Sequence, residues 1–155
     1  MPDTEAARPN LDCRAVTMAL LARAECEELS RPLEVFWPDL AFTMVRAPET
    51  GLVMLRGRMG GDGAPFNLGE ATVTRAVVEL QTGERGYAQR LGRDISGVKK
   101  AAIIEALAQR DADRPLVERN VLVPIRQRLA EEASRKRAET AATRVDFFTL
   151  VRAEG

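Results

Sequence analysis

Four arginines in the middle of the chain are the side chains best suited to specific chemistry. Arg56 and Arg58 are two positions apart and would share one face of a strand, while Arg75 lies inside an apolar run and Arg93 follows another. Converging guanidinium groups bind phosphate or phosphonate oxygens through paired hydrogen bonds. If the strands that carry them are neighbours, the sequence predicts a small-molecule site at one rim of a sheet.

The same arginines have a second interpretation, as ion-pair partners of Glu70, of Asp94 or of another protein. A charge inside an apolar strand, such as Arg75, needs a partner of this kind. The sequence favours ion pairs over ligand contact and leaves both open. A hydrolase that uses Glu70 or Asp94 is the least favoured alternative, because nothing in the spacing of the two carboxylates supports it.

Residues for nucleophilic or metal-dependent catalysis are scarce. The chain has no histidine, which is the commonest general base near neutral pH. Cys13 and Cys26 are expected in one helix as buried apolar residues, since their spacing fits no zinc or iron–sulfur pattern. The glycine loop at 57–63 is followed by a strand and not by a helix that opens with Lys and Ser or Thr, so glycine turns explain it better than a phosphate loop. We therefore predict no catalytic residue, metal or cofactor.

The composition predicts one domain, residues 1–155, and a cytoplasmic protein. Apolar residues make up 45% of the chain, and 23 basic side chains balance 23 acidic ones. This balance argues against a general attraction to nucleic acid or to an anionic membrane. The N-terminus lacks the apolar core of a signal peptide, and the apolar run after it is too short and too charged to cross a membrane.

The elements that would position the arginines form an α+β fold. Alternating apolar residues predict four strands, at 40–46, 52–58, 67–81 and 85–91. Turn-forming residues at 47–51 and 81–84 favour a mostly antiparallel meander of about four strands.

Helical spacing of apolar residues predicts helices that pack on this sheet, at 10–29, 95–109 and 125–142, with a short helix or turn at 33–37. Residues 1–9 are expected to be a flexible tail. Glu105 is expected at the edge of its helix, because a buried carboxylate is rare. Opposed charges give the long C-terminal helix a solvated face.

Residues 143–155 form an extended segment at the end of the sequence. Phe147 and Phe148 are adjacent in it, and two phenylalanines left in water would expose an unusual apolar patch. The segment either docks on the chain's own sheet or inserts into a partner subunit by strand addition. The second reading assigns the partner interface to Arg144, Asp146, Phe147 and Phe148.

Several motifs, taken in order, resemble one known family. They are RMGGDGAPFNLGEATVTRAVVEL, then GERGYAQRLGRD, then an alanine-rich helix and finally ATRVDFFTLVRAEG. Together they are similar to the G subunit of the carbon–phosphorus lyase system, the PhnG family. The resemblance covers most of the chain and is weakest before about residue 40 and between about residues 110 and 140.

The resemblance implies a bacterial cytoplasmic core complex with the H, I and J subunits of that system. With the I, H and L subunits, such proteins support transfer of an alkylphosphonate to the ribose anomeric carbon of ATP, with release of adenine. The I subunit would carry the nucleosidase chemistry, and the J subunit would break the carbon–phosphorus bond with an iron–sulfur cluster. An accessory, mainly scaffolding role fits a chain without catalytic residues. The alternative is an independent ATP- or phosphonate-binding protein that uses the arginine cluster.

Overall fold

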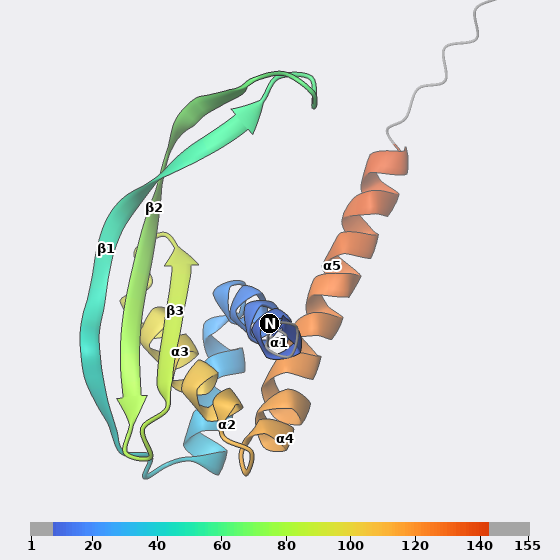
Figure 1. Cartoon of the computed structure of the whole chain (residues 1–155). Helices are drawn as coiled ribbons and strands as arrows, with labels where there is room; N and C mark the ends of the chain where they lie inside the picture. The colour runs from blue at the N-terminus through green and yellow to red at the C-terminus, as the bar shows by residue number, and fades with distance from the viewer. Residues whose placement is uncertain (1–7, 143–155) are drawn as a thin grey trace, which may run out of the picture.

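The computed structural model describes residues 8–142, with side chains from Cys13 onward, and has a three-stranded antiparallel sheet in the order β1-β2-β3. Its elements are α1 (Arg8–Ala22), α2 (Cys26–Phe36), β1 (Phe42–Arg58), β2 (Pro65–Leu80), β3 (Arg85–Leu91), α3 (Ile95–Gln109), α4 (Arg114–Val117), a π-helical turn η2 (Glu118–Leu122) and α5 (Val123–Ala142). The helices lie on one side of the sheet, and α3 packs directly on β2 and β3 (Figure 1). The predicted α+β class is confirmed.

The sheet has three strands because the first two predicted strands are one. β1 runs without a break through residues 47–51, where a turn was expected. Its register with β2 shifts between Met44 and Arg46 and again between Arg46 and Glu49. Such bulges absorb Pro48 within a strand at the edge of the sheet, where a missing N–H costs no ladder hydrogen bond. Turn-forming residues here bend a strand and do not end it.

The other predicted strands are confirmed. β2 and β3 are joined at residues 81–84, where Gly83 has a φ of +99°. On one face of β2 the side chains Thr74, Ala76, Val78 and Leu80 are buried. These positions alternate as the sequence predicted, so period-two patterning decided which face of the sheet carries the core.

Helix α3 fills the centre of the molecule and begins where predicted. The Asp94 side chain accepts a hydrogen bond from the backbone N–H of Gly97 at 2.8 Å, which caps the helix. Every residue from Gly97 to Leu107 is buried except Lys99 and Lys100. Its alanines, with Gly86 facing them from β3, let the helix lie unusually close to the sheet.

The N-terminal region differs from the prediction in three ways. α1 includes residues 8 and 9 of the expected tail, of which residues 1–7 lie outside the described part. The single helix expected at 10–29 is two helices, because Glu25 and Glu28 form a capping box that starts α2 after a short link. Cys13 and Cys26 therefore lie in different helices, and both are exposed rather than buried.

The C-terminal helix has the predicted character. Pro124 comes directly after the π-helical turn in a helix that runs on from α4, so its missing N–H falls where the hydrogen-bond spacing of the helix changes. Ile125 is buried, and beyond Glu132 every described residue is exposed. The helix therefore leaves the core and projects on the same side as the far end of the β1–β2 hairpin (Figure 1).

That hairpin extends well beyond the third strand. β3 pairs with β2 only from Glu79 to Val73, whereas β1 pairs with β2 as far as Arg58 and Pro65. Residues 52–72 therefore form a two-stranded ribbon, which we name the arm (Figure 1). Two strands alone are marginally stable in water.

The close approach of α3 to the sheet gives a first prediction. A Cβ atom at Gly86 would lie 1.9 Å from the carbonyl oxygen of Ala102, which is backbone and cannot move aside easily. We expect Gly86→Ala to lower the free energy of unfolding by about 1–3 kcal/mol or more, measured by urea denaturation. Gly51→Ala is the control, because the nearest atom is the flexible Arg75 side chain at 3.4 Å. Equal losses in both variants would contradict the close approach.

Candidate functional site

The structure does not gather the four predicted arginines at one rim. Arg75 is opposite Glu49, whereas Arg56 is opposite Asn67. Asn67 and Arg75 are eight residues apart on β2, which at 3.3 Å per residue separates them by about 26 Å. Arg93 lies beyond the end of β3. The four guanidinium groups therefore do not form a shared oxyanion site, and their ligand-binding role stays a prediction.

Arg75 has found a carboxylate, but not one of the expected ones. Its Nε lies 3.5 Å from Oε1 of Glu49, and Arg46 approaches the same oxygen at 3.4 Å. The Nε atom is buried and makes no hydrogen bond among the described residues, so the pair is held by charge rather than by good geometry. An ion pair of this exposure contributes little stability. The pair fixes the position of Arg75 over the bulged part of β1.

Arg58 belongs to the turn at the tip of the arm. Its Nη1 donates to the carbonyl oxygen of Gly63 at 3.4 Å. Gly60 and Gly61 have φ values of +63° and +87°, which favour glycine over other residues. The glycine-rich loop is therefore a tight hairpin turn, as its sequence context predicted.

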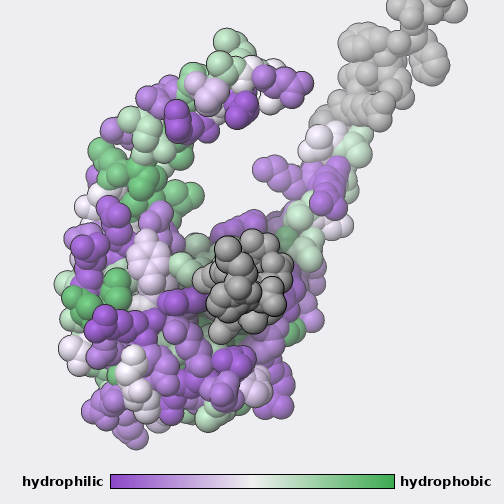
Figure 2. Space-filling model, in the orientation of Figure 1, coloured by the Kyte–Doolittle hydropathy of each residue, from purple (hydrophilic) through white to green (hydrophobic). Residues whose placement is uncertain are grey.

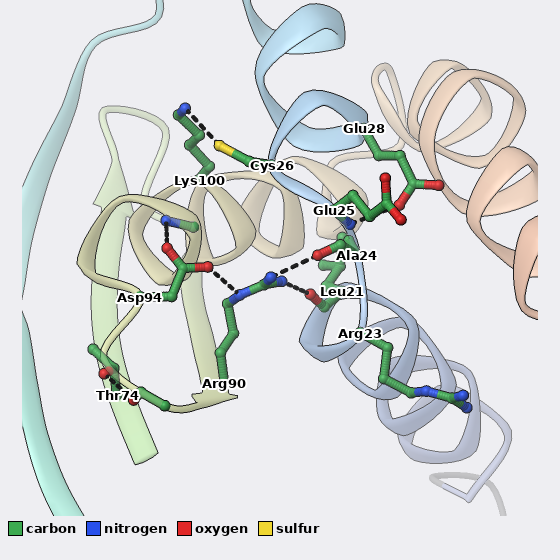
Figure 3. A network of polar contacts seen from close by, with 12 residues as sticks. Leu21, Arg23, Ala24, Glu25, Cys26, Glu28, Thr74, Arg90, Asp94 and Lys100 are labelled. Atoms are coloured by element: carbon green, nitrogen blue, oxygen red, sulfur yellow. Dashed lines mark hydrogen bonds and ion pairs between the residues drawn. The ribbon is translucent and has the colours of Figure 1, made fainter. Parts of the chain in front are cut away.

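The two carboxylates considered for hydrolysis do different things. Asp94 uses both oxygens, because Oδ1 caps α3 and Oδ2 accepts from Nε of Arg90 at 2.9 Å (Figure 3). Glu70 is exposed on the arm, opposite Met54. Asp94 therefore acts as a structural anchor, and Glu70 stands on the most extended part of the molecule.

Arg90 joins three elements and was missed by sequence reasoning. Its side chain is 11% exposed, and it donates to the carbonyl oxygens of Leu21 and Ala24 at 2.6 Å each (Figure 3). The Leu21 carbonyl lies in the last turn of α1, where its only local donor within the described residues is the N–H of Ala24 at 3.4 Å, and the Ala24 carbonyl precedes α2. The Arg90 guanidinium therefore connects the segment between α1 and α2 to Asp94 at the N-terminus of α3. The only signal in the sequence was an arginine four residues before a capping aspartate.

Glu105 is buried, which contradicts its expected place at a helix edge. It is 1% exposed and accepts from Arg14 at 2.6 Å, from the backbone N–H of Tyr87 at 2.9 Å and from Gln109 at 3.0 Å. A carboxylate with all of these donors is a satisfied structural group. The signal was present, because the flanking residues are apolar on every side of the helix.

A third arginine, Arg128, ties α5 to α2. Its Nε and Nη2 donate to the two oxygens of Glu28 at 2.8 and 2.9 Å, and its Nη1 donates to Glu132 at 2.7 Å. The bidentate hydrogen bonds from Arg128 lower the pKa of Glu28 below its usual value. One arginine of the predicted solvated face of α5 is therefore part of a tertiary contact.

Cys26 lies at the surface beside Lys100 and Ser30. Its sulfur is 3.7 Å from the Lys100 ammonium and 3.7 Å from the Ser30 hydroxyl (Figure 3). No group of three or more His, Cys, Asp or Glu side chains suited to a metal ion occurs among the described residues. Arg144, Asp146, Phe147 and Phe148 lie outside the described residues.

Of the helices within residues 8–142, none combines the length and the apolar content that a membrane span requires.

Comparison with known proteins finds both a family and an individual relative. The family model described as phosphonate metabolism protein PhnG matches residues 12–153. A protein of Rhizobium meliloti (strain 1021), named alpha-D-ribose 1-methylphosphonate 5-triphosphate synthase subunit PhnG, is 53% identical over 137 residues. That match covers 88% of this chain and 87% of the relative.

The buried Glu105 gives a second prediction. Arg14→Met leaves the carboxylate without its guanidinium partner, and we expect a loss of about 3–5 kcal/mol in unfolding free energy. Glu105→Gln should cost less, because it removes the charge together with the need to pair it. Chemical denaturation of both variants measures the difference. An equal or smaller loss in Arg14→Met would show that the pair is not a tertiary anchor.

The pair of Glu28 with Arg128 gives a third prediction, on pH. Because folding lowers the pKa of Glu28 from 4.5, its stabilisation is fully present above that pH and is lost as the pH falls through the folded pKa. We expect Glu28→Gln to cost about 1.5–3 kcal/mol at neutral pH, and progressively less below pH 4.5. Thermal or urea unfolding across pH 2.5–7 is the measurement, with the exposed Glu27→Gln as the matched control. A cost that stays constant with pH would contradict the assignment.

Proposed function

The chain belongs to the PhnG family of phosphonate metabolism proteins, and on that premise we propose that it is a non-catalytic subunit of alpha-D-ribose 1-methylphosphonate 5-triphosphate synthase. The complex would transfer an alkylphosphonate to the ribose anomeric carbon of ATP and release adenine. The observation that carries the proposal is the 53% identity, over nearly the full length of both chains, to a protein named as a subunit of that synthase. The resemblance drawn from the sequence motifs is thereby confirmed at the level of the family.

The structure supports an accessory role through the way it uses its polar residues. Arg90, Glu105 and Arg128 hold helices to the sheet or to one another, and Asp94 caps a helix. A nucleophile or general base needs a side chain that is free to exchange a proton with substrate. The rival function, an independent ATP- or phosphonate-binding protein, receives no support from four arginines that do not converge.

We propose the H, I and J subunits of the same complex as partners, with ATP and alkylphosphonate bound at the level of the complex. We also place that complex in the cytoplasm. The partner interface would include Arg144, Asp146, Phe147 and Phe148, because two adjacent phenylalanines provide apolar area and the flanking charges orient it.

The assignment of the partner interface to residues 143–155 gives a fourth prediction. We expect deletion of residues 143–155 to reduce the amount of I subunit that co-purifies with the tagged chain at least tenfold, because the apolar contact is lost. The measurement is quantitative gel analysis after co-expression of all subunits. A double variant, Phe147→Ser with Phe148→Ser, should reproduce most of the loss.

The matched control is Thr143→Ser with Thr149→Ser, which alters the same segment without removing apolar area. It should co-purify like the unmodified chain. Undiminished recovery of the I subunit with the chain that lacks residues 143–155 would contradict the assignment of the interface to this segment. Failure of the unmodified chain to recover any subunit would contradict the proposed function itself.

A further inference from the structure

The arm leaves one side of β2 without a neighbouring strand in the described part of the chain. The last contact of β2 with the β3 side is the hydrogen bond from the backbone N–H of Gly92 to the carbonyl oxygen of Thr72, at 2.8 Å. Backbone groups two residues apart in a strand point the same way, so those of Glu70 point to that open side. β1 occupies the opposite side along the whole arm. The backbone of β2 there is a template for one more strand.

The two open edges of the hairpin are built differently. The outer edge of β1 carries Pro48, two register shifts and the charged pair Arg46 and Glu49, which are features that block pairing with another strand. The open edge of β2 has a single register shift, opposite Leu55 and Arg56, no proline within residues 66–72 and a single charge. The edge of β1 is therefore protected from pairing at residues 44–49, whereas the edge of β2 at residues 66–72 is left able to pair.

The arm also exposes apolar side chains beside that edge. Leu52, Met54 and Leu68 are 60%, 54% and 65% exposed. Leu52 is opposite Thr72 and Met54 is opposite Glu70, so both lie on the face that α3 covers further along the sheet. Figure 2 shows hydrophobic residues gathered on the arm, with the surface hollowed between the arm and α5. This face has no helix over it in the described part of the molecule.

We propose that an extended segment of another subunit of the synthase adds as a strand to the edge of β2 at residues 66–72. Its side chains would pack beside Thr72 and Glu70 of β2, long apolar ones would reach across them to Leu52 and Met54 of β1, and a basic one would face Glu70. The inference rests on the proposed function, because it takes its partner from that complex. Main-chain hydrogen bonds would supply affinity, and side-chain pockets would supply specificity.

The charge of Glu70 favours a different subunit over a second copy. Glu70 is exposed, and a carboxylate covered by an added strand needs a cationic partner. Two copies that paired through the same edge would bring their Glu70 carboxylates close together, which is unfavourable in a sheet. A basic residue on the incoming strand removes this conflict.

Amide hydrogen exchange on the assembled complex tests the proposal. We expect the amides of residues 66–72 that face the open edge, including Glu70, to exchange at least tenfold more slowly in the complex than in the isolated full-length chain. An assembled complex whose residues 66–72 exchange as in the isolated chain overturns the inference and leaves the proposed function intact. If the unmodified chain assembles with no other subunit, it is the proposed function that is contradicted, and with it the inference that rests on it.

Two further outcomes of the same measurement would also overturn it. Slow exchange in the isolated chain that disappears when the chain is cut after Ala142 would mean that residues 143–155 occupy the edge. Slow exchange that grows with the concentration of the isolated chain would mean that a second copy occupies it.

A pair of variants at one position isolates the backbone contribution. Glu70→Pro removes the N–H that faces the open edge and spares the ladder with β1, whereas Glu70→Ala keeps the N–H. We expect Glu70→Pro to abolish the slow exchange of its neighbours in the complex and to lower the recovery of partner subunit at least tenfold. Glu70→Ala should lower recovery only a few-fold. Equal recovery with the two variants would overturn the strand-addition geometry.

A second variant guards against misfolding of the proline variant. Met54→Asp places a charge on the apolar face of the arm, and Val45→Asp places one at an exposed position of β1 outside the arm. With unchanged thermal unfolding of the isolated chains, only Met54→Asp should reduce recovery of the partner, by at least tenfold. Unchanged recovery with Met54→Asp would overturn the proposed contact.

Discussion

The structure depends on one carboxylate that is almost completely buried. Glu105 is placed by α3 against the sheet, where it binds a backbone N–H of β3 and a guanidinium of α1. Removing a charge from water costs several kcal/mol, and only a full set of donors offsets that cost. The donors come from elements far apart in the sequence, so α1 and β3 must hold fixed positions relative to α3. The other packing follows from this arrangement.

Two arginines also join elements that lie far apart in the sequence through hydrogen bonds. Arg90 satisfies carbonyl oxygens at the end of α1, and Arg128 joins α5 to α2. In both cases an arginine donates to oxygen atoms of an element that lies far away along the chain. Strongly polar side chains in this protein therefore serve to position elements. This use fits the accessory role that we propose for the chain.

The helices cover only the part of the sheet where three strands lie side by side, which is the lower part in Figure 1. Beyond Val73, toward the tip of the hairpin, β1 and β2 continue as the two-stranded arm with exposed apolar side chains. A ribbon of this kind gains little from its own burial, because most of its apolar surface stays in water. The free energy that keeps the chain folded therefore comes from the core beneath the helices, whereas the exposed apolar area lies on the arm. That division is the physical basis for treating the arm as an interaction surface.

The sequence by itself determined the strands β2 and β3, the helix α3 and the family. These features rest on period-two and helical patterning and on motifs, which are all local. Only the tertiary structure decided that Pro48 bends a strand without ending it, since the edge position makes its missing N–H harmless. It also decided that Glu105 is buried and that the four predicted arginines do not converge, because burial and convergence depend on partners that lie far away along the chain.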